Sequence, residues 1–409
     1  MEDKGFKIFK EKVSVAPLGI IAPKYENSDK SIGNARLLAE KIDSFLVKWA
    51  KGTPSEKDTF IIDVECPRFQ SGDGKAIINR TVRGMDLYIV VDVGDYSRTY
   101  KYFGKENHMS PDDHFMDLKR IIEAMSGKAH SVNIIMPLLY GGRQHRRTRR
   151  ESLDCAVALQ ELQHIGVNNI LTIDAHDDRV ANAIPLMTFD NIIPSYQMLK
   201  KWLNCKIDEI ESDKLIPLDK TKKINPYDIN LENLMIISPD LGASHRNDFY
   251  ASKLGCQMGM FSKRRDYKVM VNGKNPIISH DYIGEDVKGK DIFISDDMIA
   301  SGGSILDVCS VLKEKGVNRI FAYATFALFT EGLDKFDKAF EDGILTAILA
   351  TNLTYRTPEL SQKEWFLEID VSKYLAYYIA SINHDESVSE VIPPDQRIDN
   401  LLELLKKGS

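Results

Sequence analysis

Two adjacent carboxylates, Asp296 and Asp297, directly follow an apolar run in the segment DIFISDDMIASGGSILDV, residues 291–308. Carboxylates at the end of a buried strand are unfavourable unless a polar partner requires them there. The turn that follows begins a predicted helix, where backbone N–H groups and partial positive charge favour a phosphate. A phosphorylated sugar would satisfy both features, with its hydroxyls on the carboxylates and its phosphate on the turn. The turn residues are Ser301, Gly302, Gly303 and Ser304.

A capped helix with two solvated aspartates is the alternative interpretation of this segment. We favour the sugar-phosphate site because the apolar strand leads directly into the two charges. The two glycines of the turn agree with this choice, since they let a phosphate approach the backbone closely.

Polar residues follow three other apolar runs in the same way. These runs are continuous rather than alternating, which is typical of strands buried on both faces of a parallel sheet. Ligands bind beyond the carboxyl ends of the strands in such sheets. The repeated position of polar residues at predicted strand ends is therefore the main functional signal in the sequence. Together with their polar ends, the four runs are residues 132–144, 169–177, 234–246 and 291–297.

Helical patterns alternate with these runs and predict an α/β fold. In residues 152–167 and 304–317 apolar side chains recur at helical spacing, and Gly166 and Gly316 stand where a helix would end. A chain of 409 residues is too long for one ordinary core, so we expect two domains, each a mainly parallel sheet flanked by helices. Residues 204–232 are polar and irregular, which suggests a connector or an insertion.

We place the expected domain boundaries where these patterns change. The last residues read as a proline-stopped chain followed by a short amphipathic helix. The expected parts are an N-terminal extension (1–32), an N-terminal domain (33–190, joined by 378–392), a C-terminal domain (191–377) and a helical tail (393–409).

Composition favours a cytoplasmic globular protein. Hydrophobic residues make up 43% and charged residues 28% of the chain, and no apolar run approaches the roughly 20 residues of a membrane span. The N-terminus lacks a signal-peptide core, and the five cysteines lie too far apart for a zinc ribbon or a disulfide framework. A net charge of −6 argues against general nucleic-acid binding.

The run GGRQHRRTRR holds five arginines between Arg143 and Arg150. A targeting signal or a nucleic-acid patch is the alternative interpretation. In an acidic chain, a basic run directly after a strand favours a triphosphate site instead. His176 of TIDAHD is by itself weak evidence, since a lone histidine is commonly a core or surface residue.

Several blocks in order resemble ribose-phosphate diphosphokinases, the PRPP synthetases, which have tandem domains of the type I phosphoribosyltransferase fold. The resemblance covers about residues 33–392, and the order of the blocks makes it specific. The chain is similar to a divergent long-form member. The blocks are FQSGDGKAIINRTVRGMDLYIV, MPLLYGGRQHRR, TIDAHD, ISPDLGASHR, SKRR, SDDMIASGGS and DVSKYLAYYIASINHDESVSEVI.

The resemblance implies transfer of the β,γ-diphosphoryl group of ATP, with Mg²⁺, to the 1-hydroxyl of ribose 5-phosphate, giving PRPP and AMP. It implies an ATP-binding N-terminal domain, a ribose 5-phosphate-binding C-terminal domain and a homohexamer built from dimers. It implies no membrane or nucleic-acid partner. The residues implied are the catalytic Lys263 and Arg265, the ATP-binding Phe69, Ser71, Asp73, Arg143, Gln144 and His176, the sugar-phosphate residues Asp296, Asp297 and Ser301–Ser304, the diphosphate loop Asp240, Leu241, Gly242 and Ala243, and the metal ligands His176 and Asp240.

Some of these roles rest on the resemblance alone. Magnesium prefers oxygen ligands, so chemistry by itself would not select His176, and Asp174 could simply orient that histidine. Phe69, Ser71 and Asp73 are implied to reach the adenine of a neighbouring subunit, whereas a surface hairpin is the alternative. The later arginines would hold an allosteric phosphate or simply lie on the surface.

The chain also departs from the family pattern. Ala300 stands where an aspartate or threonine is common, and Ser71 and Asp73 replace asparagine and glutamate. His145 and Thr148 stand where acids are usual. Two other functions stay open at this point: a non-catalytic regulatory homologue, and a phosphoribosyltransferase that consumes PRPP.

Overall fold

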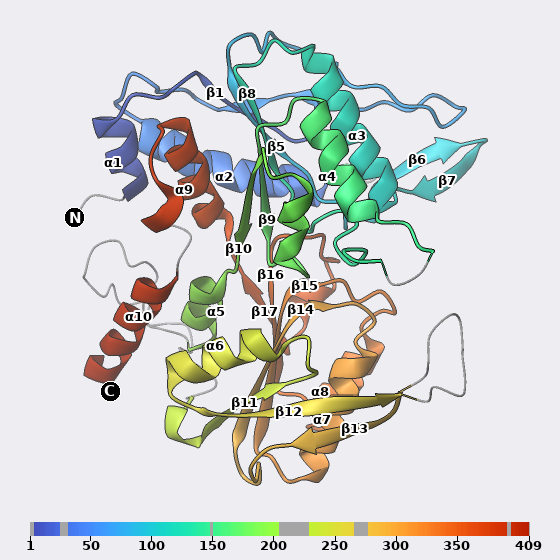
Figure 1. Ribbon diagram of the computed structural model, residues 1–409, viewed down its shortest axis with the longest axis vertical. Coiled ribbons are helices and arrows are strands. Elements are labelled where there is room, and N and C mark those ends of the chain that lie inside the picture. The colour runs from blue at the N-terminus through green and yellow to red at the C-terminus, as the bar shows by residue number, and fades with distance from the viewer. Residues whose placement is uncertain are drawn as a thin grey trace.

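The computed structural model of the protein describes residues 4–24, 32–147, 150–203, 229–265, 277–390 and 394–408. Two α/β units lie along its long axis, the first in the upper half of Figure 1 and the second in the lower half. Most of the predicted connector at 204–232, and Thr148 of the basic run, lie outside the described residues.

Within the described residues, the first unit is built on six parallel strands in the order β10-β9-β8-β5-β1-β2. Its helices include α3, which begins with a capping box between Ser110 and Asp113. The strands are β1 (Leu18–Ile21), β2 (Ile61–Ile62), β5 (Asp86–Val90), β8 (Ser131–Ile135), β9 (Asn169–Ile173) and β10 (Thr188–Ile192), and the helices are α1 (Lys4–Glu11), α2 (Asn34–Ala50), α3 (Pro111–Met125), α4 (Asp154–His164) and α9 (Ser372–Asn383).

The second unit, in the described part of the chain, has seven strands in the order β13-β12-β11-β14-β15-β16-β17. All neighbours are parallel except β12 and β13. The strands are β11 (Leu234–Ser238), β12 (Gln257–Arg265), β13 (Ile277–Ile283), β14 (Asp291–Ile299), β15 (Arg319–Ala327), β16 (Ala347–Thr351) and β17 (Phe366–Ile369), and the helices are α5 (Ser195–Trp202), α6 (Ser244–Leu254), α7 (Gly303–Glu314), α8 (Asp334–Glu341) and α10 (Asp395–Gly408).

Two small antiparallel hairpins extend the first unit. The strands β3 (Val64–Glu65) and β4 (Ile77–Ile78) form one hairpin, and β6 (Thr99–Tyr102) and β7 (Lys105–His108) form the other. The β6–β7 hairpin and α3 project on the side of the first unit away from α1 and α9 (Figure 1).

The α/β prediction is confirmed, and the reason lies in burial. The predicted strands are β8, β9, β11 and β14, of which β9 and β11 are buried at every position, as strands covered on both faces must be. The two predicted helices are α4 and α7, and Gly166 and Gly316 follow them with positive φ of 95° and 81°. Among the described residues, no helix is both long and apolar enough to cross a bilayer.

The expected N-terminal extension needs correction. Leu18–Ile21 forms β1, which lies inside the first sheet between β2 and β5 and is buried at all four positions. Helix α1 packs on α2 and on α9 (Figure 1). Four apolar residues were too short a run to stand out in the sequence, but both faces of β1 are covered, so the first unit begins well before residue 33.

The second boundary also differs from the expectation. The first sheet includes β10 up to Ile192, and the whole of α9 from Ser372 packs on the first unit rather than only residues 378–392. In the predicted helical tail the structure has helix α10, residues Asp395–Gly408. Its Ile398 and Leu401 are fully buried, and the helix contacts α5 and α6.

Asn383, at the end of α9, joins this returning helix to the first sheet. Its Nδ2 donates to a carboxylate oxygen of Asp86 at 2.8 Å and to the carbonyl oxygen of Ala16 at 3.1 Å. The backbone N–H of Val15 donates to the Asn383 carbonyl oxygen at 2.8 Å. Asp86 is 2% exposed, so each donor that it loses leaves a buried charge less compensated.

We predict that Asn383→Ala lowers the free energy of unfolding by about 2–3 kcal/mol, the scale of a lost hydrogen bond to a buried charge. Urea unfolding measures the loss. The matched control is Asn79→Ala, because Asn79 is exposed and donates to Glu65 at 2.9 Å, and a surface change of this kind stays within about 0.5 kcal/mol. Equal effects of the two substitutions would contradict the proposed joint.

Candidate active site

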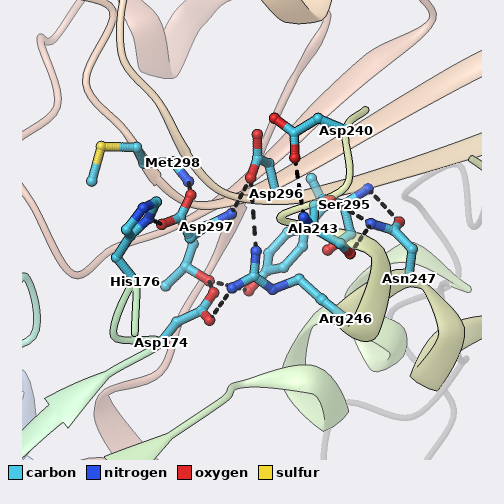
Figure 2. Close-up of polar contacts among 12 residues, drawn as sticks. Asp174, His176, Asp240, Ala243, Arg246, Asn247, Ser295, Asp296, Asp297 and Met298 are labelled. Carbon is cyan, nitrogen blue, oxygen red and sulfur yellow. Dashed lines mark hydrogen bonds and ion pairs between the residues drawn. The ribbon is translucent and has the colours of Figure 1, made fainter. Parts of the chain in front are cut away.

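The ends of β9 and β14 meet at the junction of the two units. His176, after β9, contacts Asp297, near the end of β14, through a 2.6 Å hydrogen bond between Nδ1 and Oδ2 (Figure 2). The histidine side chain is 44% exposed, whereas the carboxylate is 12% exposed. The structure therefore brings together two residues that the sequence analysis assigned to different ligands.

Arg246, in the first turn of α6, lies between carboxylates of both units (Figure 2). Its guanidinium bonds to Asp174, which follows β9, and Nη1 is 3.8 Å from Oδ1 of Asp296. Thr325 of β15 donates to the other Asp174 oxygen at 2.5 Å. One buried cation thus compensates acids from both halves of the chain.

Arg246 was not predicted from the sequence as a site residue. A usable signal was present, since Arg246 lies six residues after Asp240 and in the first turn of the following helix. Side chains in the first helical turn after a strand-end loop lie close to the neighbouring strand ends. Asp174, which was expected at most to orient His176, instead bonds to Arg246 and Thr325.

The two adjacent aspartates differ in proton affinity. Burial, together with the neighbouring Asp297 charge, raises the pKa of Asp296 to about 7. Burial opposes ionisation of Asp297 as well, but the hydrogen bond from His176 and the Arg246 charge outweigh it and lower its pKa to about 2. The same hydrogen bond raises the pKa of His176, although burial and Arg143 oppose the shift.

Asn247 fixes the position of this pair relative to α6. Its Nδ2 donates to the carbonyl oxygens of Ala243 at 2.9 Å and Ser295 at 2.8 Å, and its Oδ1 accepts from Ser295 N at 3.0 Å. The start of α6 and the end of β14 are therefore held together by one buried amide. Figure 2 shows this amide beside the loop that carries Asp240.

The predicted diphosphate loop forms a tight turn between β11 and α6. Asp240 Oδ1 accepts a hydrogen bond from Ala243 N at 3.1 Å, and Ser238 Oγ donates to the Asp240 carbonyl oxygen at 2.7 Å. Leu241 is 68% exposed at the tip, and Gly242 follows it. This geometry presents backbone at the N-terminal end of a helix, which suits an anion.

The predicted sugar-phosphate loop leads into α7. Gly302 has a φ of 86°, and a Cβ there would lie 2.1 Å from an atom of Phe336, so only glycine fits. Ser301 and Gly303 are half-buried and Ser304 is exposed. Ala300 contributes its carbonyl oxygen to Thr330 N at 3.0 Å. The loop geometry therefore depends on backbone rather than on the side chain at position 300.

The basic run lies against His176. The rings of His145 and His176 are 5.2 Å apart between centroids, and His145 Nε2 is 3.6 Å from Oδ2 of Asp177. Gln144 Nε2 donates to the Ser152 carbonyl oxygen at 2.8 Å, which closes the loop, and Arg143 is exposed beside it. A cationic loop thus borders the junction.

Two predicted groups are not brought to this junction. Phe69, Ser71 and Asp73 lie in the turn between β3 and β4, and no interaction of the described residues links them to His176 or Arg143. The backbone of Lys263 and Arg265 ends β12, paired with β13, while their side chains and residues 266–276 lie outside the described part.

The His176–Asp297 pair generates a pH prediction. The pKa of His176 is raised in the folded state. The contribution of His176 to folding stability is therefore complete below about pH 6.5 and is lost as the pH rises through the folded-state pKa. The contribution of Asp297 is lost only as pH falls towards about 2. An NMR titration of the His176 ring, assigned by His176→Gln, should give a midpoint above about 6.5.

Asp297→Asn should lower that midpoint, whereas Asp178→Asn, an exposed acid two residues from His176, is the matched control and should leave it nearly unchanged. A His176 midpoint that does not respond to Asp297→Asn would show that the contact is absent in solution.

Comparison with known proteins finds relatives of both units. Residues 31–166 match the family model for the N-terminal domain of ribose phosphate pyrophosphokinase, and residues 218–340 match the phosphoribosyl transferase domain. The ribose-phosphate pyrophosphokinase of Vibrio cholerae is 27% identical over 332 residues, covering 80% of this chain and 90% of the relative. The Shewanella oneidensis enzyme of the same name is 26% identical over the same length.

The fold is also that of a solved structure, phosphoribosylpyrophosphate synthetase from Mycobacterium smegmatis. The TM-score is 0.65 at 18% identity, and the match covers 89% of this chain and 98% of the other. The two family models lie in sequence order and jointly span well over half of the residues, one on each unit. The chain belongs to the ribose-phosphate pyrophosphokinase family.

Proposed function

We propose that this protein is a ribose-phosphate diphosphokinase that makes PRPP and AMP from ATP and ribose 5-phosphate. The observation that carries the proposal is the contact of His176 with Asp297, beside Arg246. It joins the strand end assigned to the nucleotide with the strand end assigned to the sugar. A reaction between two bound polyanions needs both within one cleft, because its catalysis consists mainly of positioning and charge compensation.

The proposed reaction is a displacement at the β-phosphorus of ATP. The anomeric oxygen of the sugar bonds to that phosphorus, and the bond to the α,β-bridging oxygen breaks. AMP leaves with the bridging oxygen, and the attacking hydroxyl releases its proton. Asp296 and Asp297 would accept hydrogen bonds from the vicinal sugar hydroxyls, and the 301–304 loop would hold the 5-phosphate through backbone N–H groups.

The donors on this chain fit a magnesium ion that arrives with the nucleotide. The described residues contain no group of three or more histidine, cysteine, aspartate or glutamate side chains suited to a metal. Magnesium commonly uses one or two protein ligands together with phosphate oxygens and water. Asp240 would supply the carboxylate and His176 a second ligand, and the bound ion would neutralise phosphate charge.

Lys263 and Arg265 would complete the charge compensation. Both lie at the end of β12, where the chain leaves the sheet next to β11 and its Asp240 loop. Arg143 and Gln144 would bind the nucleotide from the first unit. Self-association into a homohexamer built from dimers, with Phe69, Ser71 and Asp73 serving the adenine of a neighbour, is part of the same proposal.

The direct test is incubation of purified protein with ATP, Mg²⁺ and ribose 5-phosphate. PRPP and AMP are expected in equal amounts. ADP as product, or no product, would defeat the proposal, and the second result would favour a non-catalytic homologue. Conversion of PRPP and a free base to a nucleotide would instead indicate a phosphoribosyltransferase.

Lys263→Ala should then lower turnover by about 10²–10³-fold, the usual loss of one transition-state charge partner, while ATP binding changes little. Lys288→Ala is the matched control, because Lys288 is an exposed lysine in the loop after β13. Turnover that survives Lys263→Ala would show that the loop assignment is wrong.

The His176–Asp297 pair also predicts coupling between the substrates. His176 and Asp297 are hydrogen-bonded to each other, so a metal–nucleotide complex that binds His176 would free Asp297 to bind the sugar. By reciprocity, sugar bound to Asp297 would free His176 to bind the metal–nucleotide complex. Asp297→Asn weakens the pair, and we expect it to tighten Mg–ATP binding by about 5-fold without sugar, the low end of typical coupling. Calorimetry measures this affinity, with Asp307→Asn as a control on α7, and weaker Mg–ATP binding in Asp297→Asn would contradict the coupling.

A further inference from the structure

The turn that carries Phe69, Ser71 and Asp73 is held by its own hydrogen bonds and faces away from the core. Phe69 N donates to the Asp73 carbonyl oxygen at 2.7 Å, and Gly72 N donates to the Phe69 carbonyl oxygen at 2.9 Å. Ser71 Oγ donates to Asp73 Oδ2 at 2.7 Å. Phe69 is nevertheless 54% exposed, so a fixed backbone presents an aromatic face to the outside.

A buried ion cluster lies directly under this turn. Arg68 bonds in bidentate fashion to Asp117 of α3, with Nη1 to Oδ1 at 2.6 Å and Nη2 to Oδ2 at 2.9 Å. Arg120 donates to the same Oδ1 at 2.9 Å. The side chains of Arg68 and Asp117 are 7% and 1% exposed. We call Arg68, Asp117 and Arg120 the Arg68 clamp.

The Arg68 clamp also contacts Gly74, at the end of the turn, and Tyr100 of the β6–β7 hairpin. A Cβ at Gly74 would lie 2.5 Å from Nη1 of Arg68 and 2.6 Å from Nη1 of Arg120, so the backbone at Gly74 rests on both guanidinium groups. The Arg68 guanidinium also lies over the Tyr100 ring, 5.4 Å from its centroid. The turn, α3 and the β6–β7 hairpin therefore share one charged contact.

The energetics of such a cluster favour a positioning role. A buried ion pair is commonly no more stabilising than apolar residues of similar volume, because desolvation of both charges offsets their attraction. The planar guanidinium fork, in contrast, fixes the direction of its carboxylate partner in a way that an apolar contact or a lysine cannot. Phe69 directly follows Arg68 in the chain, so the fixed Arg68 side chain restricts the orientation of the backbone that carries Phe69.

We propose that Arg68 is a positioning residue, held by Asp117, that orients the Phe69 turn towards a purine nucleotide bound by a second copy of this chain. The inference rests on the proposed function. No hydrogen bond or ion pair among the described residues joins the turn to the basic loop of the same chain. Lys75 Nζ lies over the Phe69 ring, 5.7 Å from its centroid, and the exposed half of the side chain is available to another molecule. Aromatic stacking and polar side chains of this kind suit a purine base.

The test uses Arg68→Met and Arg68→Lys in the full-length protein. Both should weaken ATP binding by about 10-fold in calorimetry, the scale of a lost aromatic contact, and raise the KM for ATP similarly. The kcat and the KM for ribose 5-phosphate should stay within about 2-fold. Arg83→Met, which changes an exposed arginine of the same unit, is the control with no effect. A fall in kcat with unchanged ATP affinity, or no effect, would overturn the proposal.

A double-mutant comparison separates positioning from general support. If Arg68 acts through the turn, Arg68→Lys should add little to the loss of ATP affinity caused by Phe69→Ala. Additive losses would overturn the proposal. Because the calorimetric readout does not need the reaction, it still tests Arg68 if the protein proves not to make PRPP.

Subunit mixing tests the second copy. Co-expression of Arg68→Met with Lys263→Ala creates sites that combine an intact catalytic loop from one chain with an intact turn from the other. At ATP concentrations well below the KM, such mixed assemblies should be more active per chain than either variant alone. Absence of recovery, with both variants present in one assembly, would show that the turn acts within its own chain or not at all.

Discussion

The arrangement of the candidate site depends on one buried cation that serves both units. Arg246 bonds to Asp174 of the first unit and lies 3.8 Å from Asp296 of the second. Without it, a cluster of acids would be buried at a domain junction with insufficient positive charge, which is far more costly than a paired arrangement. The positions of His176 and Asp297, and hence of the two proposed substrates, follow from that compensation.

The parallel sheets explain why the junction can carry chemistry. In each unit the loops that follow the carboxyl ends of the strands lie at one edge of the sheet. The ends of β9 and β14 therefore bring acids and a histidine together at the junction of the two units. The fold holds the two edges together partly through α9, which follows the second sheet in sequence but packs on the first. Because the chain returns to the first unit after the second sheet, the two halves of the site keep a fixed relative position.

Much of the candidate site could be predicted from the sequence because its polar and ionisable residues lie directly after predicted strands. The acid pair, His176 and the loops at 240–243 and 301–304 all follow strongly apolar runs, so their placement at the sheet edges could be predicted. Strand β1 could not be recognised, because four apolar residues are too few to show a periodic pattern. It is identified as a strand only by its pairing with β2 and β5 in the structure. Arg246 and Arg68 were missed for a related reason: their roles depend on partners 72 and 49 residues away.

The most direct measurement of the central claim is a crystal structure with a non-hydrolysable ATP analogue, a divalent cation and ribose 5-phosphate bound together. Our account predicts the nucleotide phosphates between the Arg143 loop and Asp240, and the sugar hydroxyls on Asp296 and Asp297. The anomeric oxygen should then lie roughly 3–3.5 Å from the β-phosphorus, the distance of a reactive pair. Nucleotide and sugar bound in two separate clefts would contradict the account.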